Sequence, residues 1–353
     1  MLFRQTNRQT LLLLGAGATR GAYTGIGRSK IHPPLNKGFF REAVKLVHTP
    51  DGARYLGSFN RIKNFILREM HASSIDDVTL EEVYNVLFIS KDMPRIFSRG
   101  GRPRTAGFRR EIADFFRITV GLLRYVQLNP RHPGHVDHHA RLAASLRRGD
   151  AVLSLNYDTL MDNALTAVGW DPRVGYGFPA GHKTRFTDLT TDRSLTDVLL
   201  LKPHGSLNWF AKGSLSNYDE VLARRPPSQI VMSPVPRAYD IVSERMVRFF
   251  IPPLYSKFFA NPFWGSIWEA AFVKLTHAQS LVIIGCSLIE SDYHLRAIIL
   301  RALARRRRKL HRIVICNRSQ ETQRRIKRLF RGQADRVDVV DTFTRFVRDY
   351  CSP

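Results

Sequence analysis

The sequence predicts an α/β fold, a Rossmann-like doubly wound parallel sheet with a large helical insertion after its first strand. Short apolar runs of strand length alternate with segments of helical periodicity from about residue 150 onward. The first apolar run, residues 11–14, leads directly into a turn of Gly and Ala at residues 15–18. Each later run also ends in small or polar residues, which indicates parallel strands whose carboxyl ends share one edge.

Length and composition indicate a globular chain. Its 353 residues are 44% hydrophobic, which suits one large domain or a core domain carrying an insertion. The formal net charge of +25 attracts polyanions, so nucleic acid, an anionic dinucleotide and an acidic partner protein all remain open. A solvated basic surface explains the same charge without a partner.

The cysteines and the first residues of the chain indicate the cellular compartment. Cys286, Cys316 and Cys351 have neither zinc-ribbon spacing nor the number that a disulfide framework needs. The start of the chain has no secretory pattern, and residues 11–14 are too few to cross a bilayer. We therefore expect a cytoplasmic protein without a membrane segment.

The turn after the first strand is the first candidate for ligand binding. Gly15, Ala16 and Gly17 bring almost no side chain to the start of a helix, where backbone N–H groups can hold a pyrophosphate. The strict G-x-G-x-x-G pattern fails, because Arg20 occupies the third glycine's position and Gly21 follows one residue late. A nucleotide site and a tight structural turn both remain open.

We expect residues 1–353 to form a single domain. A core of residues 9–40 and 150–353 surrounds a helical insertion at about 41–148, in which residues 91–110 form an exposed loop. Phe39 and Phe40 are expected in the core. Two stretches lack clear periodicity, residues 170–197 and 211–262, and the second is expected to form an irregular lid or wall.

Polar groups follow the later strands where each strand ends. The expected strands are residues 151–155, 198–201, 280–284, 313–316 and 337–340. The residues at their exits that carry chemistry are Asn156, Asp158, His204, Gly285, Ser287 and Asn317. Because such exits converge beyond one sheet edge, we expect a single crevice able to hold a dinucleotide and attack a glycosidic bond.

Five short motifs, in order over nearly the whole chain, resemble the sirtuin-like NAD-binding family. The likeness is to its bacterial branch of NAD hydrolases, which act in anti-phage defence. The motifs lie at residues 15–19, 33–40, 156–158, 202–209 and 284–292. In the first of them Thr19 stands where the family has serine, and the fourth contains the stretch Lys202-Pro203-His204-Gly205.

The resemblance implies roles for single residues. The glycine turn and Thr19 would lie against the pyrophosphate, and Asn156 would hold the nicotinamide ribose or a nearby water. Asp158 would bind the nicotinamide carboxamide, and His204 would act as general base. Ser287 and Asn317 would contact the adenosine half of NAD.

Two departures from the pattern of deacetylating sirtuins reduce the number of reactions that the resemblance implies. No cysteine occurs from Gly205 to Thr276, so the zinc-binding module is absent, and Leu155 stands where deacetylases carry glutamine. The resemblance therefore implies hydrolysis or cyclisation of NAD as a substrate, without a metal. An ungated NAD hydrolase would kill its host, so we expect a gate: oligomerisation, a partner, or an occluding loop from the insertion or from residues 211–262. We expect a homo-oligomer, and the resemblance suggests a HerA-type ATPase or an Argonaute as the kind of partner. A non-catalytic NAD or ADP-ribose sensor and a nucleic-acid-associated subunit are the alternatives.

Several of these residues also have plain structural interpretations. Asn156 is a good helix cap, and Ser287 suits a strand exit that serves packing only. His132, His135, His138 and His139 favour a solvated loop entering a helix over a metal site. The basic runs at residues 305–309 and 324–331 favour a solvated surface over a docking site.

Overall fold

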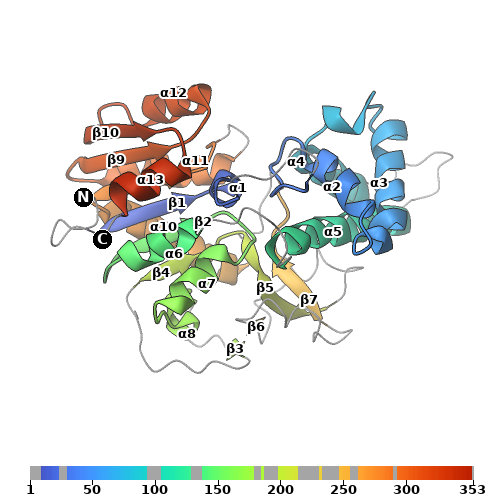
Figure 1. Ribbon diagram of the computed structural model, residues 1–353, viewed down its shortest axis with the longest axis horizontal. Coiled ribbons are helices and arrows are strands. Elements are labelled where there is room, and N and C mark those ends of the chain that lie inside the picture. Colours follow the sequence, from blue (N-terminus) through green and yellow to red (C-terminus); the bar gives the residue numbers. More distant parts are fainter. Residues whose placement is uncertain are drawn as a thin grey trace.

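The computed structural model describes residues 9–23, 30–93, 105–128, 137–178, 184–186, 198–213, 230–232, 246–254, 261–288 and 292–351. Most of these residues form two groups of elements, which Figure 1 shows side by side. We call the parallel sheet and the helices that cover it the sheet body. The helices α2 to α5 form the helical body.

The main sheet has six strands in the order β10-β9-β8-β1-β2-β4, and every neighbouring pair is parallel. The strands are β1 (Thr10–Leu14), β2 (Ala151–Ser154), β4 (Leu199–Leu201), β8 (Ser280–Ile284), β9 (Leu310–Cys316) and β10 (Ala334–Val340). The central strands β1, β2 and β8 are buried at every position, as runs of Leu, Val and Ile require when helices cover both faces. The predicted parallel α/β fold is confirmed.

The strand order reverses between β1 and β8. From β1 the chain moves outward through β2 and β4, then returns to the other side of β1 and continues through β8, β9 and β10. The helices that accompany the first direction are α6 (His138–Ser145) and α7 (Leu160–Ala167), and α13 (Phe343–Tyr350) packs against α6. The second direction brings α10 (Pro262–His277), α11 (Tyr293–Arg305) and α12 (Gln320–Leu329), which right-handed crossovers put on the opposite face.

The helical body has its own aromatic core. It consists of α2 (Phe39–Val47), α3 (Leu56–Arg68), α4 (Leu80–Asp92), α5 (Thr105–Leu128) and two short turns, η1 (Ala53–Tyr55) and η2 (Ile75–Asp77). Phe40 stacks on Phe115 with ring centroids 5.6 Å apart, and Tyr84 approaches Phe115 at 4.2 Å. The expected burial of Phe39 and Phe40 is confirmed, and they serve this core.

The limits of the helical segment differ from the prediction. α6 lies inside the expected insertion, yet it packs on α7 and α13 and so belongs to the sheet body. The loop expected at 91–110 is shorter, because α4 continues to Asp92 and α5 already begins at Thr105. The basic, glycine-containing composition of residues 91–110 favoured a loop over these helix ends, although Phe108 of α5 is buried.

A second sheet, in the order β3-β6-β5-β7, was not expected, and three of its four strands lie in stretches that were expected to be irregular. Its strands are β3 (Thr184–Phe186), β5 (Gly205–Lys212), β6 (Ile230–Met232) and β7 (Met246–Phe250). β5 pairs antiparallel with both β6 and β7. The expectation of an irregular stretch was wrong for β3, β6 and β7, and a short α8 (Pro172–Gly175) also forms in the first stretch. The lid itself falls mostly outside the described residues. Among the described residues, no helix has the length and apolarity needed to cross a membrane.

Candidate functional site

Two glycine turns meet where the strand order reverses. The N–H of Gly15 donates to the carbonyl of Ile284 over 3.0 Å, and that of Gly17 donates to Gly285 over 2.9 Å. A Cβ on Gly17 would lie 2.7 Å from the Cα of Gly285, and one on Gly285 would lie 2.0 Å from the nitrogen of Ala18. Gly285 also has φ +59°. These glycines therefore allow the turns after β1 and β8 to touch.

This contact uses backbone N–H groups that the sequence analysis predicted to bind a pyrophosphate. The N–H groups of Gly15 and Gly17 already have carbonyl acceptors, and that of Ala18 donates to Gly15 over 2.8 Å. The structural-turn interpretation thus accounts for the glycines without a ligand. The helix that begins here, α1 (Ala16–Gly21), has six residues. A role of Gly15, Ala16 and Gly17 against a pyrophosphate remains a prediction.

Asn156, Thr19 and Asp158 form one buried chain of hydrogen bonds. The side-chain Nδ2 of Asn156 donates to Thr19 Oγ1 over 3.0 Å, and Thr19 Oγ1 donates to Asp158 Oδ2 over 2.5 Å. The other carboxylate oxygen, Oδ1, accepts from the N–H of Leu160 over 3.1 Å. The three side chains, which come from α1 and the exit of β2, are each at most 8% exposed.

The same contacts determine which way the Asn156 amide faces. Nδ2 also donates to the carbonyl of Gly15 over 2.9 Å, and a carbonyl can only accept. The amide nitrogen must therefore face Gly15 and Thr19, and Oδ1 faces away from them. Among the described residues no donor reaches this oxygen, which leaves it available to a water molecule or a ligand.

His204 lies at the exit of β4, the strand next to β2, and its side chain contacts the residue that precedes Asn156. Its Nδ1 is 3.4 Å from the carbonyl of Leu155, the residue before Asn156. Since that carbonyl only accepts, the neutral ring carries its proton on Nδ1 and has its basic nitrogen at Nε2. The ring meets Trp268 edge-on at 5.8 Å, and the side chain is 7% exposed.

The glycine after His204 is a requirement of the turn. Gly205 has φ +81°, and a Cβ there would lie 2.4 Å from the Cα of Phe250 in β7. The N–H of Ile251 donates to the carbonyl of His204 over 2.8 Å. The second sheet thus holds the His204 turn against the edge of the main sheet.

Lys202 was missed as a separate element of the site. Its side chain is completely buried, and Nζ donates to Asp162 Oδ2 over 3.0 Å, to Ser206 Oγ over 2.6 Å and to the carbonyl of Asp158 over 2.6 Å. Asp162 also accepts from the hydroxyl of Tyr176, to which Asn208 Nδ2 donates over 3.1 Å. A lysine within an otherwise apolar and small stretch was the only signal for it in the sequence.

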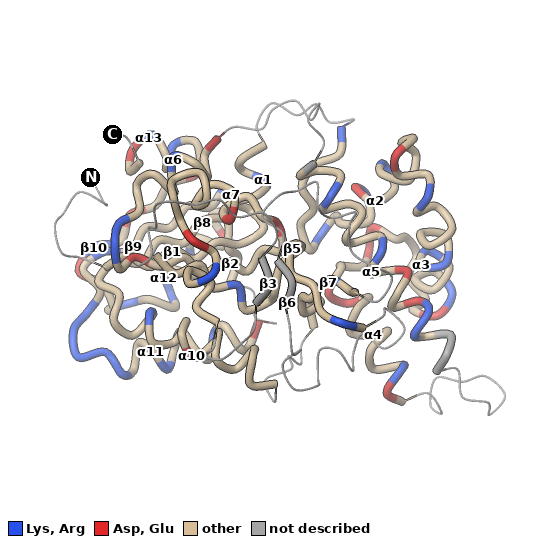
Figure 2. The backbone as a smooth tube through the Cα atoms, turned by 90° about the horizontal axis from the view of Figure 1, so that it is seen from below, with Lys and Arg blue, Asp and Glu red and all other residues tan. Residues whose placement is uncertain are grey.

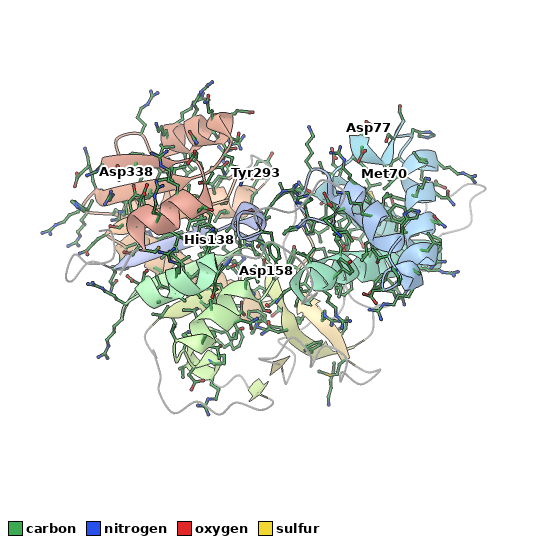
Figure 3. The ribbon with its side chains drawn as sticks, in the orientation of Figure 1. Met70, Asp77, His138, Asp158, Tyr293 and Asp338 are labelled. Atoms are coloured by element: carbon green, nitrogen blue, oxygen red, sulfur yellow. The ribbon has the colours of Figure 1, made fainter. Side chains whose placement is uncertain are left out.

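The helical body reaches the same turn. Gln127, in the last turn of α5, hydrogen bonds to Thr159 through both its amide nitrogen and its oxygen. Tyr23 donates to the carbonyl of Val126 over 3.3 Å, and burial, with a smaller effect of Asp158, raises the pKa of its phenol well above the usual range. In Figure 3 Asp158 is labelled between the sheet body and the helical body.

Ser287 and Asn317 also lie at this edge, with structural partners. Asn317 Nδ2 donates to the carbonyl of Cys286 over 3.3 Å, and its Oδ1 accepts from the N–H of Ser319 over 3.0 Å. The carbonyl of Ser287 accepts from Arg325 Nη2 over 2.8 Å. Both residues therefore stabilise the exits of β8 and β9, and their contact with an adenosine stays a prediction.

Two of the plain interpretations were wrong in detail. His138 and His139 are buried at the start of α6 against Phe343, and His138 Nε2 lies 2.9 Å from Thr344 Oγ1. They are not solvated, while His132 and His135 fall outside the described residues. The part of the chain that the structure describes holds no cluster of His, Cys, Asp and Glu suited to a metal ion.

Arg306 also departs from the expected solvated run. Its guanidinium donates to the carbonyls of Leu275, Thr276 and Ala278 at distances of 2.6–2.9 Å, and desolvation lowers its pKa. These are carbonyls that the end of α10 leaves without helical partners. Arg306 is thus a helix cap supplied by a neighbouring loop.

The predicted site residues thus come together in one connected set. A single path of contacts runs along the carboxyl edge of the sheet, from Asn317 through the turns of β8 and β1 to Asn156 and Asp158. It continues through Lys202 to the turn that carries His204. Asn156 and His204 lie at adjacent strand exits, as predicted.

Comparison with known proteins found solved structures of low similarity and no family. No protein-family model matches the sequence, and no curated protein does. One similar solved structure is a Sir2 in complex with the inhibitor EX-527, 2′-O-acetyl-ADP-ribose and a deacetylated p53 peptide. The sequences are 12% identical, the alignment covers 97% of this chain and 92% of that chain, and the TM-score is 0.35. Another is Sir2Tm bound to a propionylated peptide, which is 12% identical to this chain. That alignment covers 99% of this chain and 93% of that chain, with a TM-score of 0.37. The class of the protein, a doubly wound α/β protein, is defined by its own strand order.

Proposed function

We propose that this protein cleaves the N-glycosidic bond between nicotinamide and ribose in NAD and releases nicotinamide and ADP-ribose. The observation that carries the proposal is the contact set at the carboxyl edge, where Asn156, Thr19 and Asp158 form one hydrogen-bonded chain beside the His204 turn. This set lies next to the point where the strand order reverses, the place where ligands bind to open α/β sheets. The order of the five sequence motifs supports the same substrate.

The proposed reaction needs little acid catalysis. Nicotinamide leaves as a neutral molecule and takes the electron pair of the broken bond, so positive charge develops on the ribose. A carboxylate and an amide oxygen held in fixed positions stabilise that charge. Asn156 Oδ1 supplies the amide oxygen beside the ribose, and Asp158 supplies the carboxylate from its place at the nicotinamide end of the substrate.

A proton acceptor completes the scheme. Water adds to the ribose carbon from which nicotinamide has departed, and its proton passes to His204 Nε2, either directly or through a ribose hydroxyl. The 3.4 Å contact between Nδ1 and the Leu155 carbonyl holds the tautomer that makes Nε2 basic. Under this proposal Asn156 and His204 are catalytic, and Asp158 binds the nicotinamide end of the substrate.

The direct test is nicotinamide release from NAD by the purified chain, alone and with candidate activators, because a gated enzyme is inert without its trigger. Asn156→Ala and His204→Ala should each reduce the rate by at least about a hundredfold. His277→Ala is a matched control, because His277 lies exposed at the end of α10, away from the edge. Equal rates for the wild type, the two site variants and the control would contradict the proposal.

A non-catalytic NAD or ADP-ribose sensor is the second candidate. The completeness of the internal bonding favours it, because both carboxylate oxygens of Asp158 and both amide hydrogens of Asn156 already have partners. Calorimetric titration with NAD separates the candidates. Saturable binding that Asn156→Ala abolishes, without nicotinamide release under any condition tested, would establish the sensor.

The proposed biological setting is depletion of NAD in anti-phage defence by a gated, cytoplasmic homo-oligomer. An ungated NAD hydrolase would kill its host, so full activity of an isolated monomer would contradict the gate. Light scattering of the active species measures its subunit number. Co-purification tests an association with a HerA-type ATPase or an Argonaute.

A further inference from the structure

Positive charge is concentrated in one part of the sheet body. Residues 301–331 contain thirteen Lys and Arg residues and a single acid, Glu321, which is about half of the whole chain's net charge of +25. This segment comprises the end of α11, strand β9 and helix α12. The site residues at the carboxyl edge do not explain this charge.

Six exposed cations of the segment lie at the opposite edge of the sheet. The helices α11 and α12 run antiparallel to the strands that they connect, so their carboxyl ends meet the amino ends of β9 and β10. The N–H of Leu310 donates to the carbonyl of Gln333 over 2.8 Å, which holds the two connecting loops side by side. We call the six cations the basic rim: Arg307, Arg308, Lys309, Lys327, Arg328 and Arg331.

The basic rim lacks internal compensation. No described acidic side chain forms an ion pair with any of its six members, whereas Arg312 on β9 and Arg336 on β10 both pair with Asp338. Figure 2 shows the α11–β9 loop as a continuous blue segment at one end of the molecule. Only Arg306, which caps α10, has a structural reason for its charge in that loop.

We propose that the basic rim binds the phosphate backbone of a nucleic acid. Guanidinium groups match phosphate in geometry, and four of the six members are arginines. A protein partner would need apolar anchors at the centre of its interface. The large exposed apolar side chains among the described residues lie outside the two loops, and the nearest in sequence, Leu300 and Val337, are in α11 and β10. Contacts to phosphate need no such anchors.

The rim and the proposed NAD site are spatially separate. Strands of five to seven residues separate the two edges by roughly 20 Å. Nucleic acid on the rim therefore leaves the carboxyl edge open. The proposal is independent of NAD cleavage and can fail or succeed without it.

The test is fluorescence anisotropy of the full chain with a labelled 20-base-pair DNA, the matching single strand and an RNA of the same sequence. Six phosphate contacts give a slope of log affinity against log salt of about −5 for the duplex, or about a thousandfold loss between 50 and 200 mM salt. The triple variant Arg307→Gln/Arg308→Gln/Lys309→Gln should bind at least about tenfold more weakly and reduce that slope by about 3. Arg306 is left in place because α10 depends on it.

A matched control removes three cations from the helical body. Lys37, Lys63 and Arg68 are exposed and form no ion pair with a described residue, so their Gln variants change the net charge equally. Equal binding by the two triple variants would overturn the proposal, as would an absence of binding at 50 mM salt. If polyglutamate of equal charge displaces the labelled DNA as effectively as unlabelled DNA does, the rim binds an acidic protein instead. Different affinities for DNA and RNA would identify the source of the phosphates.

Discussion

Lys202 donates a hydrogen bond from Nζ to the main-chain oxygen of Asp158 over 2.6 Å, although its side chain has no solvent exposure. The other two hydrogens of its ammonium group go to Asp162 and Ser206. A lysine has three donors, so all of them are satisfied. This single cation therefore ties the turn after β2 to the turn that carries His204.

Lys202→Met should reduce the free energy of unfolding by about 3–5 kcal/mol, because it leaves Asp162 buried without its cation. The double variant Lys202→Met/Asp162→Asn removes both charges and should recover most of that loss. Urea denaturation of the three proteins measures both effects.

Recovered stability should not bring recovered activity. In the double variant the carbonyl of Asp158 still lacks its donor, so NAD cleavage, once detected in the wild type, should remain at least about tenfold slower. Local hydrogen exchange at the N–H of Leu207, which donates to Tyr157 over 2.9 Å, should be faster. A stable double variant with wild-type cleavage and exchange would show that Lys202 does not position the site.

Thr19→Val should destabilise the protein by about 1–3 kcal/mol. Valine keeps the shape of threonine, but the buried carboxylate of Asp158 loses a donor and the amide of Asn156 loses an acceptor. Thr19→Ser retains the hydroxyl and should remain within about 1 kcal/mol of the wild type. Thermal unfolding of the pair measures the difference, and equal midpoints would show that the hydroxyl contributes nothing.

Gly285→Ala should prevent folding or reduce stability by several kcal/mol, because its Cβ would lie 2.0 Å from the backbone nitrogen of Ala18. Gly38→Ala is the control. Gly38 has φ +82° with nothing within 4 Å of its Cβ position, so this substitution should cost only about 1 kcal/mol. Soluble yield and denaturation midpoints give the comparison. Similar effects of the two substitutions would disprove the close contact between the β1 and β8 turns.

Asp150 should make stability fall as the pH rises from about 4 to 6. Desolvation raises its pKa to about 6, although the N–H groups of Thr10 and Arg147 donate to its carboxylate. The folded state thus holds this proton more tightly than the unfolded chain, whose carboxyl has a pKa near 3.9. Ionisation in the fold accordingly removes stability of order 2–3 kcal/mol, fully lost above pH 6.

Asp150→Asn is neutral at every pH and should lack this component. Urea denaturation of both proteins at several pH values between 4 and 7 measures it. The difference in unfolding free energy, wild type minus variant, should decrease over that interval. Parallel profiles would show that Asp150 keeps an ordinary pKa in the fold.

The sequence by itself determined the parallel sheet and the order of its exits. Residues 11–14 and 281–284 are uniformly apolar because both faces of their strands are covered, and this pattern is local. Asn156, Asp158 and His204 were predicted as site residues in the same way, since each lies within three residues of the end of such a run. The antiparallel strands β5 and β7 were missed, because their pairing joins segments far apart in the chain.

Only the tertiary structure decided what the individual polar groups do. Lys202 and Arg306 read alike as cations in the sequence, yet one is a buried tether and the other caps α10. The sequence could not show that the N–H of Gly17 donates to the carbonyl of Gly285, a residue far away in the chain. The apolar periodicity that predicts a strand or helix is a property of neighbouring residues in the sequence. The hydrogen-bond partners of a polar side chain depend instead on which distant segments the fold brings within about 3 Å of it.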